Sequence, residues 1–558
     1  MEACHSALRF SAHDEKVKKR GGIARPEDIL ALSQFTDRLC FVDDVLQVLS
    51  VHCRGEKKKK ENEGKQQEGE MGGSKTYKQI CFDLTRNFFL GVIRPMLLNT
   101  NEETAEVGAL YVRFIIDTLW KDRIVGAEKS GRVLLYDRKD GMGSGLRRIS
   151  PILQILVEFV VGSSSTNTTT TTTIALDEET ARVEEESLNL RTALIERVNS
   201  VSSTLSLASL GLFGSLLDLN VPHVSNVLIS SYFKSHQIST SPITYFLSHH
   251  EKMKDEEDLD APITLGVAAT RFLDLFQGTS WPSASEKSLS TYLYDAQSRS
   301  VAVQCLGTFG WIAVDSTITD NVKNVNTNAS KIEEGPFLES VFDKLENFLN
   351  LTMDEALEVT NVVSKLALCI FLFHFFFFQF TLQLILLSHK HTHSPTHTSG
   401  TNRDIFCRFF ACDDDGDDDN DSKPTKRSLI TILRRVWNDA KTRKNRIKDF
   451  SERLREVRVE LGIIEKDVED EVIVEEEGKE ELVDWDVERR KFVIAYAVLI
   501  ELLKEIAAIL QATEWLVNAE RRQATWLKKS SNSDSQEDGG SSDGTTRGRL
   551  SSDSRFAL

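Results

Sequence analysis

The stretch FLESVFDKLENFLNL, residues 337–351, places apolar side chains three and four positions apart, which is the spacing of an amphipathic helix. The next four residues, TMDE, form a capping box, in which Thr352 and Glu355 each satisfy a free backbone amide at the start of a second helix. The two helices therefore meet in a tight hairpin. Such paired helices are the expected building unit of the chain.

The same spacing recurs on both sides of this hairpin, and almost nowhere does an alternating strand pattern persist. A first helix after Pro26 carries one apolar face, made of Ile29, Leu32, Phe35, Leu39, Val42, Leu46 and Leu49. Further helices are predicted over residues 77–98, 102–120, 184–200, 202–219, 428–461 and 487–516. The fold class is all-α, and the pairing of helices favours an armadillo-like helical solenoid with disordered inserts and a disordered tail.

Composition shifts divide the chain into segments. Residues 54–74 contain almost no apolar side chain and cannot bury enough surface to offset their ordering entropy. The predicted order is an N-terminal helical segment (1–53), a disordered insert (54–74), a helical body (75–368) with a low-complexity break near 163–175, an apolar then acidic insert (369–426), a C-terminal helical part (427–520) and a disordered tail (528–558).

Net charge and cysteine content limit the class of function and the cellular compartment. The 558 residues include 85 acidic and 68 basic side chains, a formal charge of -17 that argues against bulk binding to nucleic acid. The eight cysteines are scattered without a CxxC pair, which indicates a reducing compartment. The N-terminus lacks the apolar core of a secretory signal. These features predict a cytoplasmic protein.

Motifs that would support catalysis are missing from the sequence. It contains no nucleophile elbow, Walker loop, HExxH motif, kinase signature or deaminase signature. The glycines at 141–145 and the acidic run at 413–421 fit a loop and a linker better than a nucleotide or calcium site. Cys407 and Cys412 have no second cysteine pair nearby and only a His-rich stretch as a further ligand source. We therefore expect a protein that is not an enzyme, with no catalytic, cofactor-binding or metal-binding residue and no cofactor.

The predicted helix over 428–461 is strongly basic. Two interpretations remain: its basic face docks an acidic coiled coil or anionic lipid headgroups, or it is solvated and partly neutralised by the acidic linker before it. Local charge specifies no partner, which favours the solvated face. The basic residues are Arg434, Arg435, Lys441, Arg443, Lys444, Arg446, Lys448, Arg453, Arg455 and Arg458.

Residues 366–387 are uncharged over 22 positions, long enough for a membrane span of about 20 residues. A transmembrane anchor is one interpretation. The other is a translated, unspliced intron over about 370–400, because the Phe- and Leu-rich run suits pyrimidine-rich codons and the His- and Thr-rich run after it suits CA-rich codons. Internal His and Gln residues, and the helical body directly before the segment, favour the intron.

The last predicted helix, 487–516, combines a broad apolar face with charged positions. Leu499, Leu502, Leu503, Ile506 and Ile509 share the apolar face. The charged residues Glu501, Lys504 and Glu505 are predicted to lie on the opposite side. The apolar face makes this helix a central part of the C-terminal core.

Four stretches, taken in order, resemble the FHIP family, also known by its retinoic-acid-induced-like domain. They are RNFFLGVIRPMLLNTNEETAEVGALYVRFIIDTL (86–119), LNLRTALIERVNSVSSTLSLASLGLFGSLLDLNVPHV (188–224), FLESVFDKLENFLN with the later VTNVVSKLAL (337–368), and RRKFVIAYAVLIELLKEIAAI (489–509). Each is an amphipathic helix or helix pair, and their shared order carries the resemblance.

The resemblance implies a non-enzymatic scaffold that links early endosomes to the dynein motor. Its implied partners are a HOOK-type coiled-coil adaptor, an inactive ubiquitin-conjugating-like subunit and an early-endosomal Rab GTPase. The implied location is cytoplasmic and peripheral on early endosomes. The alternative function is an integral membrane protein anchored by residues 366–387.

Overall fold

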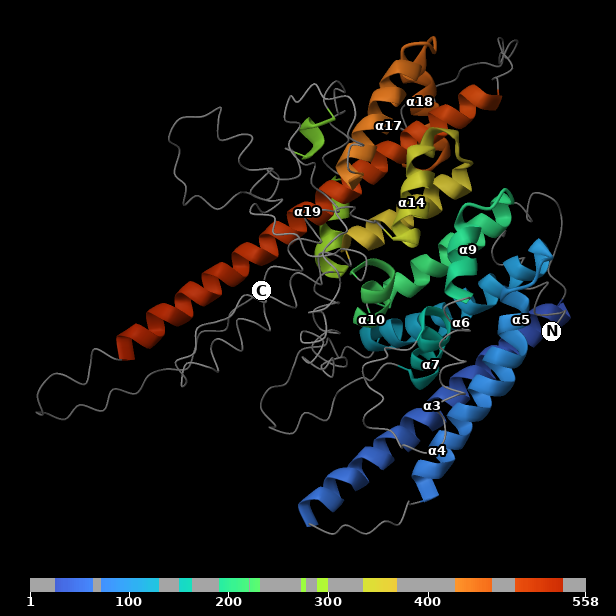
Figure 1. Cartoon of the computed structure of the whole chain (residues 1–558). Coiled ribbons are helices and arrows are strands. Elements are labelled where there is room, and N and C mark those ends of the chain that lie inside the picture. The colour runs from blue at the N-terminus through green and yellow to red at the C-terminus, as the bar shows by residue number, and fades with distance from the viewer. Residues whose placement is uncertain are drawn as a thin grey trace, which may run out of the picture.

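The computed structural model describes residues 26–63, 72–129, 150–162, 190–219, 221–230, 272–276, 289–299, 335–368, 427–463 and 487–534. Every regular element within these residues is a helix, so the prediction of an all-α fold is confirmed (Figure 1). The apolar faces of these helices share one hydrophobic core that runs from α3 to α19.

The N-terminal part is a helical hairpin. Its first arm is α3 (Pro26–Glu63) and its second arm begins with α4 (Gly72–Asp83), and the two lie side by side (Figure 1). α3 runs past the predicted boundary at residue 53, through a Lys- and Glu-rich stretch whose residues have high helix propensity. A prediction based only on apolar spacing misses this end of α3, because a helix of such residues does not depend on an apolar face.

The second arm changes its winding partway along. α4 continues as a π-helix, η1 (Leu84–Ile93), and then as α5 (Arg94–Leu97). The helix predicted over 77–98 is thus present, with a wider middle. The π-helix ends beside Pro95, which has no N–H to donate to the preceding turn. Its last bond runs from the Arg94 N–H to Phe89 O, five residues back.

The middle of the molecule is built on α6 (Glu102–Lys129) and α9 (Ser203–Asp218), which pack closely against each other. Arg113 and Asp117 of α6 lie against Gly211 and Ser215 of α9, so the contacts advance in the same direction along both helices. The two helices are therefore parallel. α7 (Pro151–Val161), the short helices α10 (Pro222–Ser225) and η3 (Asn226–Ser230), and a helix over 190–198 complete this region.

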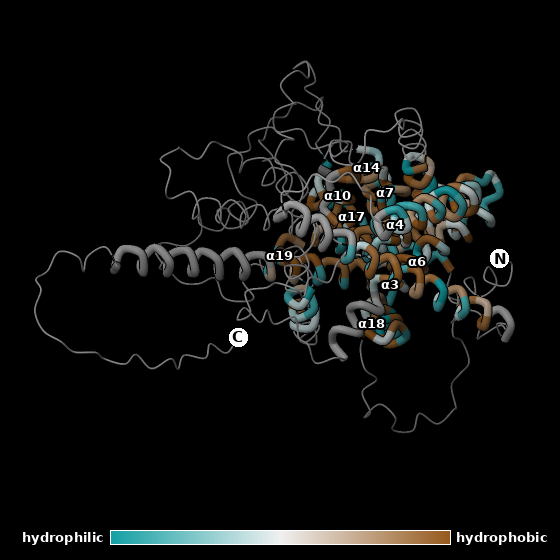
Figure 2. The backbone as a smooth tube through the Cα atoms, turned by 90° about the horizontal axis from the view of Figure 1, so that it is seen from below, coloured by the Kyte–Doolittle hydropathy of each residue, from teal (hydrophilic) through white to brown (hydrophobic). Residues whose placement is uncertain are grey.

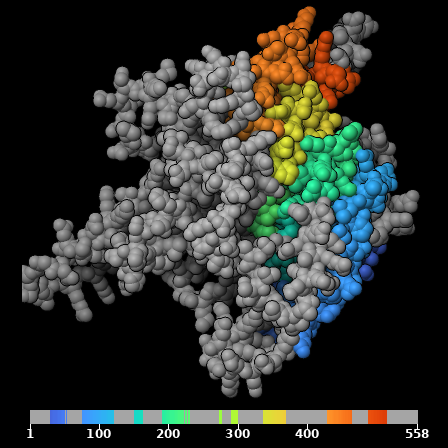
Figure 3. Space-filling model, viewed as in Figure 1, coloured from blue at the N-terminus to red at the C-terminus, as the bar shows by residue number. Residues whose placement is uncertain are grey.

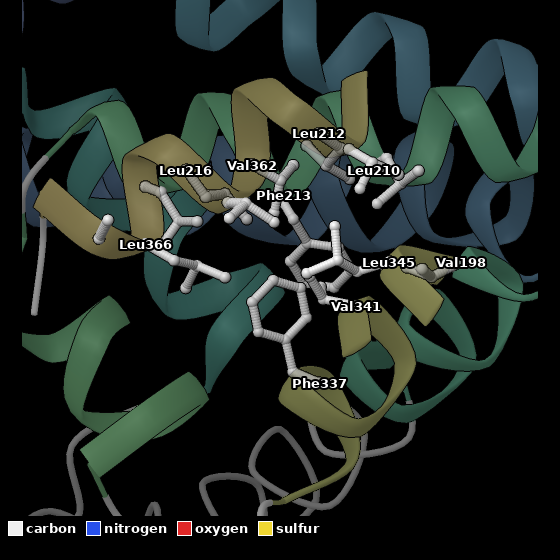
Figure 4. Packing of buried hydrophobic residues seen from close by; sticks show 14 of the residues in the cluster. Val198, Leu210, Leu212, Phe213, Leu216, Phe337, Val341, Leu345, Val362 and Leu366 are labelled. Carbon is white, nitrogen blue, oxygen red and sulfur yellow. The ribbon is translucent and has the colours of Figure 1, made fainter. Parts of the chain in front are cut away.

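The helical hairpin predicted around residues 337–355 is present. α14 (Pro336–Glu346) and the 3-10 turn η6 (Phe348–Asn350) precede a helix over 353–368. The Thr352 N–H donates to Glu355 Oε2 at 3.1 Å, and the Glu355 N–H donates to Thr352 Oγ1 at 3.3 Å, which confirms the capping box. Phe337 of α14 packs on Phe213 of α9, with ring centroids 4.7 Å apart (Figure 4).

The helix over 353–368 continues the parallel row beside α9. Glu358 approaches Gly211, whereas Lys365 pairs with Asp218 at 2.5 Å, so contacts again advance together along both helices. Arg113 of α6 reaches Glu358 across Gly211, where an added Cβ would collide with the guanidinium. The described surface follows this order in space, from the N-terminal hairpin to the C-terminal helices (Figure 3).

The basic region forms two helices, α17 (Leu429–Lys444) and α18 (Phe450–Glu460), so the prediction of one helix over 428–461 is wrong. The break ends at Asp449, which has a left-handed backbone with φ 56°. It allows Phe450 to turn inward, where its ring lies 4.9 Å from that of Tyr496 in α19 (Val487–Asp534). The gain from burying this aromatic ring explains why the helix breaks there.

α19 is buried on nearly every side over residues 492–512. The hydropathy colouring in Figure 2 shows this part of α19 as mainly hydrophobic. Leu499, Leu502 and Leu503 have no exposed surface, as the apolar face predicts. The charged residues predicted on the opposite side are also removed from solvent, since Lys504 is only 1% exposed and the Glu501 and Glu505 side chains are 12% and 20% exposed. Packing of α18, η6 and the helix over 289–299 around α19 is the reason.

Candidate interaction surface

The outer face of α3 carries apolar side chains that face solvent. Leu30, Phe41 and Val48 are 59%, 67% and 69% exposed. They share this face with exposed polar residues, and successive positions are four, three, four, three and four residues apart, which is the heptad spacing of a coiled-coil seam. We call this row the α3 stripe: Leu30, Gln34, Asp37, Phe41, Asp44 and Val48.

The opposite face of α3 is the one that the sequence predicts to be buried. Leu39 and Leu46 are 6% and 0% exposed, and Leu32, Phe35 and Val42 pack partly buried against the core. Ile29, assigned to the same face, is instead 56% exposed, because it lies in the first turn, before the partners of α3 begin. The predicted face is confirmed for the five residues from Leu32 to Leu46, and Leu49 is partly buried.

The α3 stripe is a candidate interaction surface that the sequence analysis did not identify. Leu30, Phe41 and Val48 fall between the residues of the buried face, so the helix is apolar on two sides. The residues of the buried face outnumber the apolar residues of the stripe, so the sequence pattern alone predicts a single apolar face on the buried side. The available signal was the second row itself, whose heptad spacing does not fit a helix with one buried side.

Aromatic packing fixes α3 against its neighbours and leaves the stripe outward. The ring of Phe35 lies 6.3 Å from Phe88 of η1, 6.2 Å from Tyr111 of α6 and 6.5 Å from Phe114 of α6. Contacts of this kind add to the stabilisation that burial of the rings provides. The stripe is therefore displayed on a helix held by two other elements.

A buried carboxylate provides a second anchor. Asp43, 2% exposed, accepts a short hydrogen bond from the hydroxyl of Ser150 and one from the Gln47 side-chain amide at 2.6 Å. Ser150 in turn caps α7, accepting from the Leu153 N–H at 3.1 Å. This network ties α3 to the first turn of α7, 107 residues further along the chain.

We expect Asp43→Ala to lower the free energy of unfolding by about 1–3 kcal/mol, because the Ser150 hydroxyl loses its acceptor in a buried site. Asp43→Asn, which keeps one acceptor oxygen, should cost less. Urea unfolding followed by circular dichroism measures both variants. Equal stability of Asp43→Ala and the unmodified chain would contradict an anchoring role for this network.

Several charges of the basic helices pair with other residues of the chain, although the Arg435 and Arg443 side chains remain 56% and 37% exposed. Arg435 donates to Glu346 at 2.9 Å, and Arg443 donates to Asn350 at 2.8 Å, so α17 is joined to α14 and η6. Lys441 and Lys444 lie over aromatic rings of Trp437 and Phe450. These contacts give four of the ten basic residues a partner within the chain, a role that neither sequence interpretation predicted.

A charged cluster lies at the centre of the C-terminal helices. One oxygen of Glu501 accepts from Lys504 at 3.0 Å and from Arg458 at 3.3 Å, and the other accepts from the Tyr292 hydroxyl at 3.2 Å. Burial lowers the pKa of Lys504 and raises that of Glu505. Burial, helped by the nearby Glu501, also raises the pKa of Tyr292. The cluster joins α18, α19 and the helix over 289–299, and its closed, paired geometry suits a structural role.

Several predicted features lie outside the described residues. They include the glycines at 141–145, Cys407, Cys412, the run at 413–421 and most of the apolar segment 366–387. Only residues 366–368 of that segment are described, and they are buried at the end of a helix. Among the described residues, none of the helices has the length and apolarity to cross a membrane, and no cluster of His, Cys, Asp or Glu is arranged to hold a metal ion.

Comparison with models of protein families gives a match in the middle of the chain. Residues 334–399 match the model of a family of unknown function, DUF5917. The matched stretch contains α14, η6 and the helix over 353–368, which carries Glu358 and Lys365. No curated protein matches the chain. The central hairpin is therefore similar to part of this family, and the match indicates no activity.

Proposed function

We propose that the chain is a non-enzymatic, armadillo-like scaffold that links early endosomes to the dynein motor through a HOOK-type coiled-coil adaptor. An inactive ubiquitin-conjugating-like subunit and an early-endosomal Rab GTPase are the other proposed partners, and the proposed location is cytoplasmic and peripheral on early endosomes. The proposal starts from the four collinear stretches that resemble the FHIP family. The α3 stripe is the observation that carries it, because its heptad spacing suits a helical partner.

The stacking of helices supports the solenoid part of the proposal. α6, α9 and the helix over 353–368 run parallel and neighbour one another, while α14 packs on both α9 and α17. Repeated helix pairs arranged in two rows are typical of α-solenoids, which bind partners along extended surfaces. The net charge of -17 favours protein partners over nucleic acid.

Phe41→Asp should weaken binding to a HOOK coiled coil by roughly thirtyfold, since an exposed aromatic residue at the centre of an interface is often a hot spot. Phe41 is 67% exposed, so the folded chain should keep its thermal stability. Surface plasmon resonance with an immobilised HOOK coiled-coil fragment measures the affinity.

Val201→Asp is the matched control, because Val201 is an apolar residue that is fully exposed on a turn distant in sequence from α3. It should bind as the unmodified chain does. If the unmodified chain fails to bind the HOOK fragment, the proposed function is wrong. If Phe41→Asp binds normally, the stripe is not the contact surface.

A further inference from the structure

Two carboxylates interrupt the apolar residues of the α3 stripe. Asp37 and Asp44 are exposed and lie seven residues apart, so they project from the same face about 10 Å from each other along the helix axis. Phe41 stands between them, and Leu30 and Val48 flank the pair. Within the described residues neither carboxylate takes part in a hydrogen bond or ion pair. Their neighbour Asp43, by contrast, is committed to the buried anchor with Ser150.

A helix that packs along the stripe must cover these carboxylates together with the apolar residues. The knobs of a facing helix insert at successive heptad positions, so contact with Leu30, Phe41 and Val48 also places partner side chains over Asp37 and Asp44. Removing an unpaired carboxylate from water is strongly unfavourable. A purely apolar helix, or one with acidic residues at these positions, would therefore be rejected.

We propose that the α3 stripe selects an amphipathic helix in which apolar heptad positions are combined with two Lys or Arg residues one heptad apart, placed to pair with Asp37 and Asp44. This inference rests on the proposed function of the stripe as a partner-binding surface, and adds the chemistry by which it chooses the partner. Phe41 and its apolar neighbours supply contact area, whereas the two aspartates supply specificity.

The net negative charge of the whole chain also favours a basic partner helix. With a formal charge of -17, the protein attracts basic segments at long range and repels acidic ones. Such attraction raises association rates and weakens as salt screens it. Binding of the selected helix should therefore fall with added salt more steeply than binding through apolar contacts alone.

Two designed helical peptides test the inference with the full chain. Both carry the same apolar heptad positions and a fluorescent label, and they differ only at two positions one heptad apart, which are Lys in one peptide and Glu in the other. Fluorescence anisotropy should show that the Lys peptide binds at least about tenfold more tightly, because like charges placed together oppose binding. Asp37→Lys combined with Asp44→Lys should reverse this preference.

The double variant is expected to fold normally, since both aspartates are exposed, and circular dichroism checks this. Phe41→Ala removes contact area without changing the charge of the stripe, so it should weaken both peptides to a similar extent. If the double variant leaves the preference for the Lys peptide unchanged, the aspartates do not select the partner, although the stripe can still be the binding surface. If Phe41→Ala affects neither these peptides nor a HOOK fragment, the stripe itself fails as a docking surface.

Discussion

Leu503→Asp should unfold the C-terminal helices α17, α18 and α19, at a cost of about 4–5 kcal/mol or more in the free energy of unfolding. Leu503 has no exposed surface, and neighbouring residues on every side of α19 are buried as well. A carboxylate at this position has no room to reach solvent. The variant also loses the apolar contacts of the leucine, which alone cost about 2–5 kcal/mol when a buried leucine is truncated.

Leu503→Met is the control for this experiment, since it keeps the volume and apolar character of the side chain and should cost less than about 1.5 kcal/mol. Thermal unfolding followed by circular dichroism distinguishes the two variants. An unchanged melting temperature for Leu503→Asp would show that this face of α19 is open to solvent. That face of α19 would then be a candidate surface for binding a partner and not part of the core.

Local sequence patterns predict the parts of the fold that local interactions decide. The capping box at Thr352 and Glu355 is an example, because both of its hydrogen bonds span three residues. The buried face of α3 is another, since Leu39 and Leu46 share it at helical spacing. In each case the pattern is complete within one or two turns, so no knowledge of distant partners is needed.

Features that depend on distant partners escape such patterns. The charges of α19 look solvated in the sequence, yet Glu501 is satisfied by Arg458, 43 residues away, and by Tyr292, 209 residues away. The turn between α17 and α18 likewise depends on where Phe450 can pack. The polar side of a helix is exposed only if nothing packs over it, and a single sequence does not contain that information.

The α3 stripe illustrates the opposite difficulty. Apolar residues such as Phe41 and Val48 are expected to be buried, and only the arrangement of α4, α6 and α7 on one side of α3 shows that they are not. A large exposed apolar row on a folded helix is a sign of a binding surface. The candidate site was thus visible in the sequence as a second apolar row, but its exposure was not.

Glu501→Ala is expected to lower the free energy of unfolding by about 3–5 kcal/mol, because removing one partner of a buried ion pair leaves charge uncompensated. Two cations would remain in the cluster, Arg458 with an 8% exposed side chain and Lys504 with a 1% exposed side chain. The hydroxyl of Tyr292 would also lose its acceptor. Chemical unfolding of the full chain, followed by circular dichroism, measures the effect.

Lys504→Met is the matched control within the same cluster. It removes one cation and leaves Arg458 and Glu501 as a one-to-one pair at 3.3 Å. Because burial disfavours the charged form of Lys504, replacing it with an apolar side chain of similar length should cost less than about 1.5 kcal/mol. A larger loss for Lys504→Met than for Glu501→Ala would contradict the charge balance proposed for the cluster.

The loss caused by Glu501→Ala should depend on pH in a defined direction. Burial already holds the pKa of Lys504 below 10.5, and Glu501 opposes that shift, so removing Glu501 lowers the folded-state pKa further. Between this lowered value and 10.5 the unfolded chain binds more protons than the folded chain, and stability therefore rises as pH rises through that window.

The difference in the free energy of unfolding between Glu501→Ala and the unmodified chain should shrink from neutral pH to about pH 9.5. The recovery is partial because Arg458 stays charged. A difference that stays constant over this range would mean that Lys504 is not the buried cation left unpaired.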